Sequence, residues 1–520
     1  MARRCTACRQ WLRHALHPQH PDRPGKDGER CWSPAGRRCS CTASSATHRR
    51  LSEVDTTTGT ELWRLGASEL AAAIRNRRTS SRDVVEAHLA RIEAANRGVN
   101  AVTEVLADAA LRAAEDADRR IAAGEARGSL HGVPFTVKEN IDVAGSPTTQ
   151  GVAALAEAVP DVDAPQVANL RDAGAIPLAR TNQPDFGLRH HTDSGLYGPV
   201  RNPWDSSRTP GGSSGGEAAA VAVGMTPLGV GNDFGGSLRW PAQCNGICAL
   251  RPSLGRIPHA TVLEPADPPI SMQFMAAQGP LARHVQDLRV ATEAMIRTST
   301  RDPWHVPLPL AGEPPRRPVK VAVVVNPAGV STSPQVAGGV KRAAQALAEA
   351  GYAVEEVGPP DVERAADLYL RIAAPDVRLI WPSMAPVVSE DTDRNMRALL
   401  DSAPEVDAAA HMQAFMARRA LCRAWASFQV ERPLVLGPVC TEPPFKVGAD
   451  LTQKGVEAIL ASMRMALAVN LLGLPAVAVP TGLADGLPQE VQVIGPRFRE
   501  DLCLDAAQAI EDACGTLTPI

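Results

Sequence analysis

The sequence predicts a layered α/β protein with one large domain. Short apolar or alternating runs, which are typical of strands, are separated by stretches with helical periodicity in both the first and the last third of the chain. The 520 residues are 44% hydrophobic and 21% charged, close to the composition of ordinary globular proteins. A chain of this length can bury a large core, so strands covered by helices are expected.

The first elements come before residue 180. Val85, Leu89 and Ile92 fall at helical spacing. Ser81 precedes this stretch and Gly98 follows it, which predicts a helix capped at both ends. The next expected elements are a helix over 105–123, a strand over 133–138, a helix over 167–173 and a strand over 175–178.

The middle and the end of the chain continue the pattern without an internal repeat. Residues 209–236 are rich in glycine at both ends and small and apolar between them. A proline-rich connection at 303–318 is expected to join two parts of one domain, because the strands on its two sides are of one kind. Later strands are expected at 319–325, 353–357, 434–436, 476–479 and 491–494, and later helices at 340–349 and 502–512.

Residues 1–52 are expected to form a disordered basic tail ahead of a single domain over 53–520. The first 50 residues carry 11 Lys or Arg against 3 Asp or Glu, whereas the rest of the chain carries 43 against 54. Five of the 11 cysteines lie in the tail, but only Cys5 and Cys8 have the spacing of zinc ligands. Cys39 and Cys41 are too close in sequence, so no metal site is expected.

Three function classes are disfavoured by composition. The acidic body argues against nucleic-acid binding, which depends on clustered Lys and Arg. The longest uncharged run, 465–484, is interrupted by proline and glycine, so no membrane span is expected. Residues 1–50 lack the apolar core of a secretory signal, and the sparse cysteines of the body suit a reducing compartment. A cytoplasmic location is therefore expected.

Three short segments carry the chemistry. They are GVPFTVKEN at 132–140, GGSSGG at 211–216 and NDFGGSLR at 232–239. Each has an ordinary structural interpretation on its own, as a strand end, a linker or a turn. GGSSGG, however, runs directly into a small-residue helix at 217–223, for which Ser213 or Ser214 is a natural cap, and a linker would not begin a buried helix.

The third segment can supply donors for an oxyanion. Consecutive glycines allow backbone shapes that other residues cannot adopt, so several N–H groups can point at one oxygen. Loss of one such donor typically costs about 3 kcal/mol of transition-state stabilisation. The expected donors are the N–H groups of Phe234, Gly235, Gly236 and Ser237.

Lys138 can act as a base only if its environment changes its charge state. Lowering a lysine pKa from 10.4 to about 7 requires roughly 4.6 kcal/mol of differential destabilisation, which burial must supply. If Lys138 faces the site, strand alternation turns Val137 and Glu139 to the other face. Glu139 then cannot pair with the amine and hold it charged.

Taken together, the three segments resemble the amidase signature family. The resemblance covers about residues 60–515 and includes RNPW at 201–204 and LLGLPAVAVPTGLADGLPQEVQVIG at 471–495. It implies a large central mixed β-sheet flanked by α-helices on both faces. It also implies that Lys138 is the base, Ser213 the bridging serine after a cis peptide bond, and Ser237 the acylated nucleophile. Residue patterns alone do not choose between Ser213 and Ser214.

The resemblance implies an acyl-transfer reaction without a metal or organic cofactor. A proton passes through Ser213 to Lys138, Ser237 attacks the carbonyl carbon, ammonia or an amine leaves, and water releases the acid. Three positions depart from the common family pattern, in which a Thr and two Ile stand where this chain has Asn232, Phe234 and Leu238. We expect unchanged chemistry and an altered pocket shape. By resemblance, Asp233 and Arg239 brace the loop, and Gly187 and Leu188 line the acyl pocket.

Three alternative functions fit parts of the sequence. A conventional serine hydrolase would use Ser213 in G-x-S-x-G and needs a later histidine, of which the last is His411. A glutaminase-like amidase subunit of a tRNA-dependent amidotransferase would share the catalytic set, although the stretch after Gly255 lacks that subunit's typical run. A non-enzymatic amidase-like scaffold would have no use for a buried neutral lysine. The expected partner is a small-molecule amide, and relatives often form homodimers.

Overall fold

A computed structural model describes residues 59–126, 128–263 and 267–519. The tail predicted at 1–52 lies outside the described residues, as does the predicted boundary at 52/53. From Gly59 to Ile520 the chain forms one unit. No single described helix is long and apolar enough to cross a membrane, and one bent pair of helices, Gln453–Ser462 and Arg464–Leu472, meets that test only jointly.

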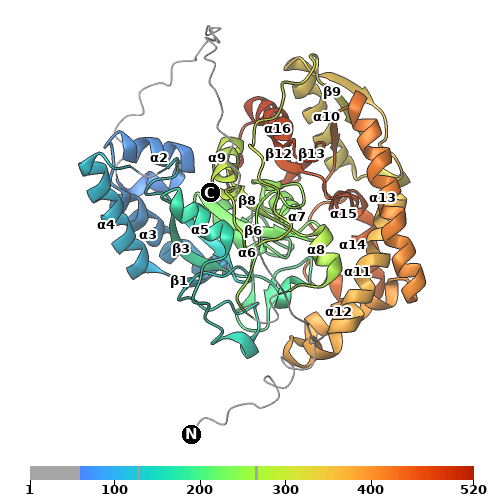
Figure 1. Cartoon of the computed structure of the whole chain (residues 1–520), viewed down its shortest axis with the longest axis horizontal. Coiled ribbons are helices and arrows are strands. Elements are labelled where there is room, and N and C mark those ends of the chain that lie inside the picture. Colours follow the sequence, from blue (N-terminus) through green and yellow to red (C-terminus); the bar gives the residue numbers. More distant parts are fainter. Residues whose placement is uncertain (1–58, 127, 264–266, 520) are drawn as a thin grey trace, which may run out of the picture. The chain divides into compact units, whose positions relative to one another are not determined.

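A mixed sheet of 11 strands runs through the described part of the chain. Figure 1 shows it from the early strands β1 and β3 at one side to the late strand β9 at the other. A separate two-stranded sheet joins β4 (Asp193–Ser194) and β5 (Gly198–Pro199). In order, the large sheet contains β1 (Val102–Val105), β3 (Ile176–Thr181), β2 (Pro134–Lys138), β6 (Leu228–Asp233), β8 (Ala277–Ala282), β7 (Cys248–Arg251), β12 (Ala476–Ala484), β13 (Leu487–Ile494), β11 (Leu434–Gly437), β9 (Lys320–Val323) and β10 (Ala353–Glu356).

Side chains alternate between two cores, one on each face of the sheet. In β9, Val321 and Val323 belong to one core whereas Ala322 belongs to the other. The same alternation separates Val435 from its two neighbours in β11, as the two-residue period of a strand requires. The sheet is therefore buried on both faces, and the predicted fold class is confirmed.

Helices cover both faces. The first face carries α2 (Ala67–Arg75), α5 (Pro165–Asp172), α9 (Val285–Met295), α10 (Pro334–Glu349) and α16 (Glu500–Cys514). The second carries α6 (Gly215–Ala222), α7 (Arg239–Asn245), α8 (Ile270–Met275), α11 (Val362–Met384), α13 (Ala408–Glu431) and α15 (Arg464–Leu472). Helices α3 (Ser81–Val99) and α4 (Ala107–Ala123) pack together near β1, and α12 (Glu390–Ser402) packs on α14 (Gln453–Ser462).

The expected elements are present, with shifted ends. The helix predicted after Ser81 begins at Ser81 itself and is capped by Ser80, whose hydroxyl accepts the Asp83 N–H. It continues through Gly98 and ends before Asn100, which is in the left-handed conformation. The helix predicted over 105–123 begins at residue 107, because residues 102–105 pair with β3 as strand β1.

Three neighbouring strands end at one edge of the sheet. Strand β2 is parallel to both β3 and β6. Their carboxyl ends carry Lys138, Thr181 and Asp233. Parallel strands place such ends together, and this edge of an α/β sheet is where ligands commonly bind.

Candidate active site

Lys138 is fully buried at the end of β2. Its Nζ atom lies 2.6 Å from Ser213 Oγ and 2.8 Å from Asn232 Oδ1. Burial lowers the pKa of Lys138 from 10.5 to about 7, although the charges of Asp233 and Glu217 oppose this shift. Among the described residues no carboxylate lies within ion-pair distance of the amine. An uncharged amine can accept a proton near neutral pH.

Glu139 lies away from Lys138, as strand alternation predicts. Its carboxylate accepts hydrogen bonds from the hydroxyls of Thr103 and Thr149. Both conditions on Lys138 that follow from the sequence, burial and the lack of a carboxylate partner, are therefore met in the described structure.

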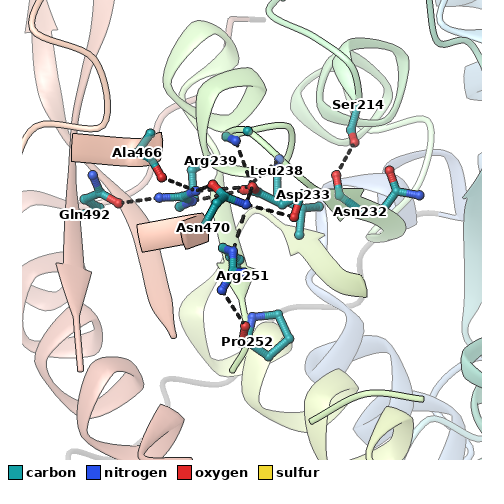
Figure 2. Close-up of polar contacts among 12 residues, drawn as sticks. Ser214, Asn232, Asp233, Leu238, Arg239, Arg251, Pro252, Ala466, Asn470 and Gln492 are labelled. Atoms are coloured by element: carbon teal, nitrogen blue, oxygen red, sulfur yellow. Dashed lines mark hydrogen bonds and ion pairs between the residues drawn. The ribbon is translucent and has the colours of Figure 1, made fainter. Parts of the chain in front are cut away.

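Ser213 follows a cis peptide bond from Gly212, in the geometry that the family resemblance implies. Gly212 packs directly on another backbone segment, since a Cβ atom there would lie 2.5 Å from the Arg189 carbonyl oxygen. Ser214, the alternative to Ser213, begins α6 but makes no capping hydrogen bond with its side chain. Its hydroxyl instead lies 3.4 Å from the Asn232 carbonyl oxygen (Figure 2). The serine in contact with Lys138 is thus Ser213.

Ser237 lies in the loop between β6 and α7. It is 9% exposed, in contrast to the fully buried Lys138, so a small substrate can reach its hydroxyl. Its carbonyl oxygen accepts the Ser214 N–H at 3.3 Å, which ties the two serine-containing loops together. Within the described residues no hydrogen bond joins the Ser213 and Ser237 hydroxyls.

Asp233 organises the loop that precedes Ser237. Its carboxylate accepts the N–H of Gly236 at 2.8 Å and that of Leu238 at 3.2 Å. Gly236 has φ +102°, a conformation that favours glycine. The Gly236 N–H is thus directed at Asp233. Among the expected oxyanion donors, the N–H groups of Phe234, Gly235 and Ser237 have no acceptor in the described part of the chain.

A buried network holds Asp233 in place (Figure 2). Arg239 Nε donates to Asp233 at 3.0 Å, and Arg239 also reaches Asn470 at 2.6 Å and Gln492 at 2.8 Å. Asn470 Nδ2 donates to Asp233 Oδ1 at 2.9 Å. Burial alone would raise the pKa of Asp233, but the nearby Arg239 and Arg251 charges hold it below its usual range. The expected ion pair between Asp233 and Arg239 is confirmed.

Two residues near Lys138 were not predicted as site residues. Asn232 replaces a residue that is Thr in the common family pattern, and it contacts the amine directly, so the expectation that this departure leaves the chemistry untouched needs revision. Its orientation is fixed because its Nδ2 donates to Asn140 Oδ1 at 2.9 Å. Glu217 lies in the first turn of α6, where a sequence pattern shows only a polar residue in a helix of small residues.

The expected pocket residues Gly187 and Leu188 differ in what the structure shows of them. A Cβ atom at Gly187 would lie 3.2 Å from Ser213 Oγ, which places this glycine beside the candidate site. Leu188 is partly buried after the short 3-10 helix Asp185–Gly187. Close to the Ser237 loop, the rings of Phe234 and Tyr369 lie 5.4 Å apart, and Tyr369 Oη would meet a Cβ atom at Gly235 at 2.8 Å. Aromatic side chains therefore flank the loop.

The alternative catalytic histidine has other contacts. His411 lies in α13, where its ring packs 5.3 Å from that of Phe415. The hydrogen-bond partner of Ser213 is a lysine. Across the described ranges, no group of three or more His, Cys, Asp or Glu side chains is arranged to hold a metal ion.

Comparisons with known proteins agree with this geometry. The family model described as Amidase matches residues 83–504. An indoleacetamide hydrolase from Bradyrhizobium diazoefficiens is 43% identical over 459 residues, which cover 88% of each chain. The A-type chain of a glutamyl-tRNA(Gln) amidotransferase from Salinispora arenicola is 32% identical over 495 residues, covering 88% of this chain and 99% of that one.

Solved structures share the fold. A bacterial aryl acylamidase of the amidase signature enzymes superposes with a TM-score of 0.75 at 27% identity, covering 86% of this chain and 96% of that chain. A 6-aminohexanoate cyclic dimer hydrolase complexed with substrate superposes with a TM-score of 0.74 at 26% identity, covering 88% and 99%. The chain therefore belongs to the amidase family, and it is a hydrolase that acts on amides.

Proposed function

We propose that this chain hydrolyses a small carboxylic amide to the acid and ammonia or an amine, and that arylacetamides such as indoleacetamide are its best candidate substrates. The 43% identity to an indoleacetamide hydrolase over 88% of both chains supports this substrate class. The Phe234 and Tyr369 rings beside the Ser237 loop support it independently, because aromatic faces and edges bind an aryl group well.

The observation that carries the proposal is the contact between Lys138 and Ser213. The neutral amine accepts the Ser213 hydroxyl proton while Ser213 accepts the proton of Ser237, whose oxygen bonds to the amide carbon. Asn232 accepts one N–H of the amine and so helps to direct its lone pair toward Ser213.

The carbonyl oxygen becomes an oxyanion in this step. We propose that the N–H groups of Phe234, Gly235 and Ser237 bind it, while Asp233 keeps the Gly236 and Leu238 N–H groups for itself and so fixes the loop. The carbon–nitrogen bond then breaks and the proton held by Lys138 returns through Ser213 to the leaving amine. Water enters by the same route in reverse and releases the acid from Ser237.

The catalytic set is complete in protein side chains, so we propose that the reaction uses no metal or organic cofactor. All six described cysteines are free thiols, which supports a reducing location such as the cytoplasm. A homodimer without nucleic-acid or membrane partners is proposed on the family resemblance and the acidic charge of residues 51–520.

Ammonia release from indoleacetamide by the purified chain tests the proposal. We expect turnover by the wild type, loss of more than about 99% of it in Lys138→Ala and Ser237→Ala, and near-normal turnover in His411→Ala. If His411→Ala is inactive while Lys138→Ala works, the conventional serine hydrolase is the correct assignment.

A second candidate function is that of a glutaminase-like component of an amidotransferase. It is favoured by the 32% identity to one chain of such an enzyme, of which the match covers 99%. This candidate would release ammonia from glutamine only together with its partner proteins. Assays of glutamine and indoleacetamide side by side, with the chain alone, separate the two functions. Turnover of indoleacetamide and not of glutamine supports the first proposal, and no turnover of either without a partner supports the second.

A further inference from the structure

Glu217 is a buried carboxyl group on the same face of the sheet as Lys138. It lies in the first turn of α6, four residues after Ser213, and is completely buried. Thr136 and Lys138 are two residues apart in β2 and therefore share a face. The hydroxyl of Thr136 donates to Glu217 Oε1, and the hydroxyl of Thr181, which pairs with Lys138 in the sheet register, donates to Oε2.

The sheet leaves space for this carboxyl group. Gly229 of β6 is paired with Thr136 of β2, and a Cβ atom at Gly229 would overlap the Glu217 carboxyl. A glycine at this position lets Glu217 lie flat on three strands, which are β3, β2 and β6. The carboxyl thereby connects the helix after Ser213 to the strand that ends in Lys138.

The charged groups around Lys138 and Glu217 lie on neighbouring elements. Lys138 faces Glu217 from α6 and Asp233 from β6, and the Asp233 charge is already countered by Arg239 and Arg251. Glu217 faces Lys138 from β2 and Arg180 from β3. Burial raises the pKa of Glu217 to about 7, against the lowering effect of its two hydroxyl donors. No described cation lies within ion-pair distance of it.

We propose that Glu217 is a positioning residue for Lys138: it anchors the start of α6 on β2 and β3, and its negative charge favours the protonated amine. The inference rests on the proposed function, in which that amine is the base. Removing the negative charge while keeping the hydrogen bonds should make the amine easier to deprotonate.

Glu217→Gln is the direct test. Glutamine can accept one threonine hydroxyl and donate to the other, so the anchor is kept while the charge is lost. The chain also offers a matched control in Glu139→Gln, because Glu139 is buried, next to Lys138 in sequence and bound by two threonine hydroxyls, but faces away from the amine.

The measurement is the pH dependence of fluorophosphonate labelling of Ser237, which needs the base but no particular amide. We expect the acidic midpoint of the labelling rate to move down by at least about half a pH unit in Glu217→Gln and to stay unchanged in Glu139→Gln. Thr181→Val is the second variant if Glu217→Gln fails to fold. Loss of one donor favours the neutral carboxyl, so the midpoint should move in the same direction.

The outcomes separate the role of Glu217 from the proposed function. A wild type that shows no labelling of Ser237 at any pH contradicts the proposed function itself. A wild type that is labelled with an acidic midpoint, together with a folded Glu217→Gln of the same midpoint or a Glu139→Gln that shifts equally, contradicts only the role of Glu217.

Discussion

At the scale of single residues, Lys138 shows how burial creates a base. The sequence was sufficient to place it at a strand end and to turn Glu139 away. It could not reveal Asn232 as a second partner, because that contact joins residues 94 positions apart on two strands. The choice of Ser213 over Ser214 likewise depended on family resemblance, since neighbouring serines in a glycine-rich loop have no local pattern to distinguish them.

The pH dependence of kcat/KM follows from the Lys138 environment. Since burial lowers its pKa to about 7, the amine is charged below that pH and cannot accept a proton. We expect kcat/KM for indoleacetamide to fall about tenfold per pH unit below about pH 7 and to level off above it. A flat profile between about pH 5 and about pH 8 would rule out Lys138 as the base.

Asn232→Asp places a carboxylate where an amide oxygen now lies 2.8 Å from Lys138 Nζ. An adjacent negative charge favours the protonated amine and raises a lysine pKa by about 1 to 3 units. We expect kcat/KM at pH 7 to fall at least about tenfold and its acidic limb to move to higher pH. Asn232→Thr, which adds no charge, is the control and should not move the limb upward. Equal profiles for both variants would refute this account of Asn232.

At the scale of elements, the structure differs from expectation where glycine obscures the pattern. Helices such as α3 were predictable because their apolar spacing is regular. Strand β6 was not predicted, because Gly229 and Gly231 occupy its second face and leave no side-chain alternation. These glycines make room for other groups, since Cβ atoms there would meet Glu217 and the Ser214 hydroxyl. The feature that hid the strand is the feature that shapes the site.

Two glycine-to-alanine substitutions should have opposite effects. A methyl group at Gly212 would lie 2.5 Å from a carbonyl oxygen of Arg189, and backbone cannot move aside cheaply. Gly98 lies in α3 with open space around it, so alanine there should stabilise the protein by about 0.5 to 1 kcal/mol. Urea denaturation should show Gly212→Ala destabilised by about 1 to 3 kcal/mol, with ammonia release largely lost. Wild-type activity in Gly212→Ala would contradict the close packing of that loop.

At the scale of the whole molecule, the candidate site is held together by contacts between distant parts of the chain. Asp233 bonds Asn470 across 237 positions, and Arg239 bonds Gln492 across 253. Periodicity in a sequence window reports only local structure, so this network could not be predicted beyond the ion pair of Asp233 with Arg239. The order of the 11 strands was equally hidden, because most neighbours in the sheet are not neighbours in sequence.

The Asp233 network predicts strong coupling between its members. Asp233→Ala leaves the Arg239 charge buried without its partner, which typically costs about 3 to 5 kcal/mol. Adding Arg239→Ala should cost much less than its own single effect, as a double-mutant cycle in urea denaturation would reveal. The exposed pair Asp116 and Arg120 in α4 is the control, with an expected coupling below about 1 kcal/mol. Additive effects at Asp233 and Arg239 would contradict the network.

The central claim is that Ser237 is the nucleophile and Lys138 its base, and one measurement tests it most directly. The folded chain is labelled with a fluorophosphonate and digested, and peptide mass spectrometry locates the modified residue. We predict one phosphonyl group on Ser237, and labelling at least about a hundredfold slower in Lys138→Ala. Modification of Ser213 or Ser214 in place of Ser237, or wild-type labelling rates in Lys138→Ala, would contradict the account.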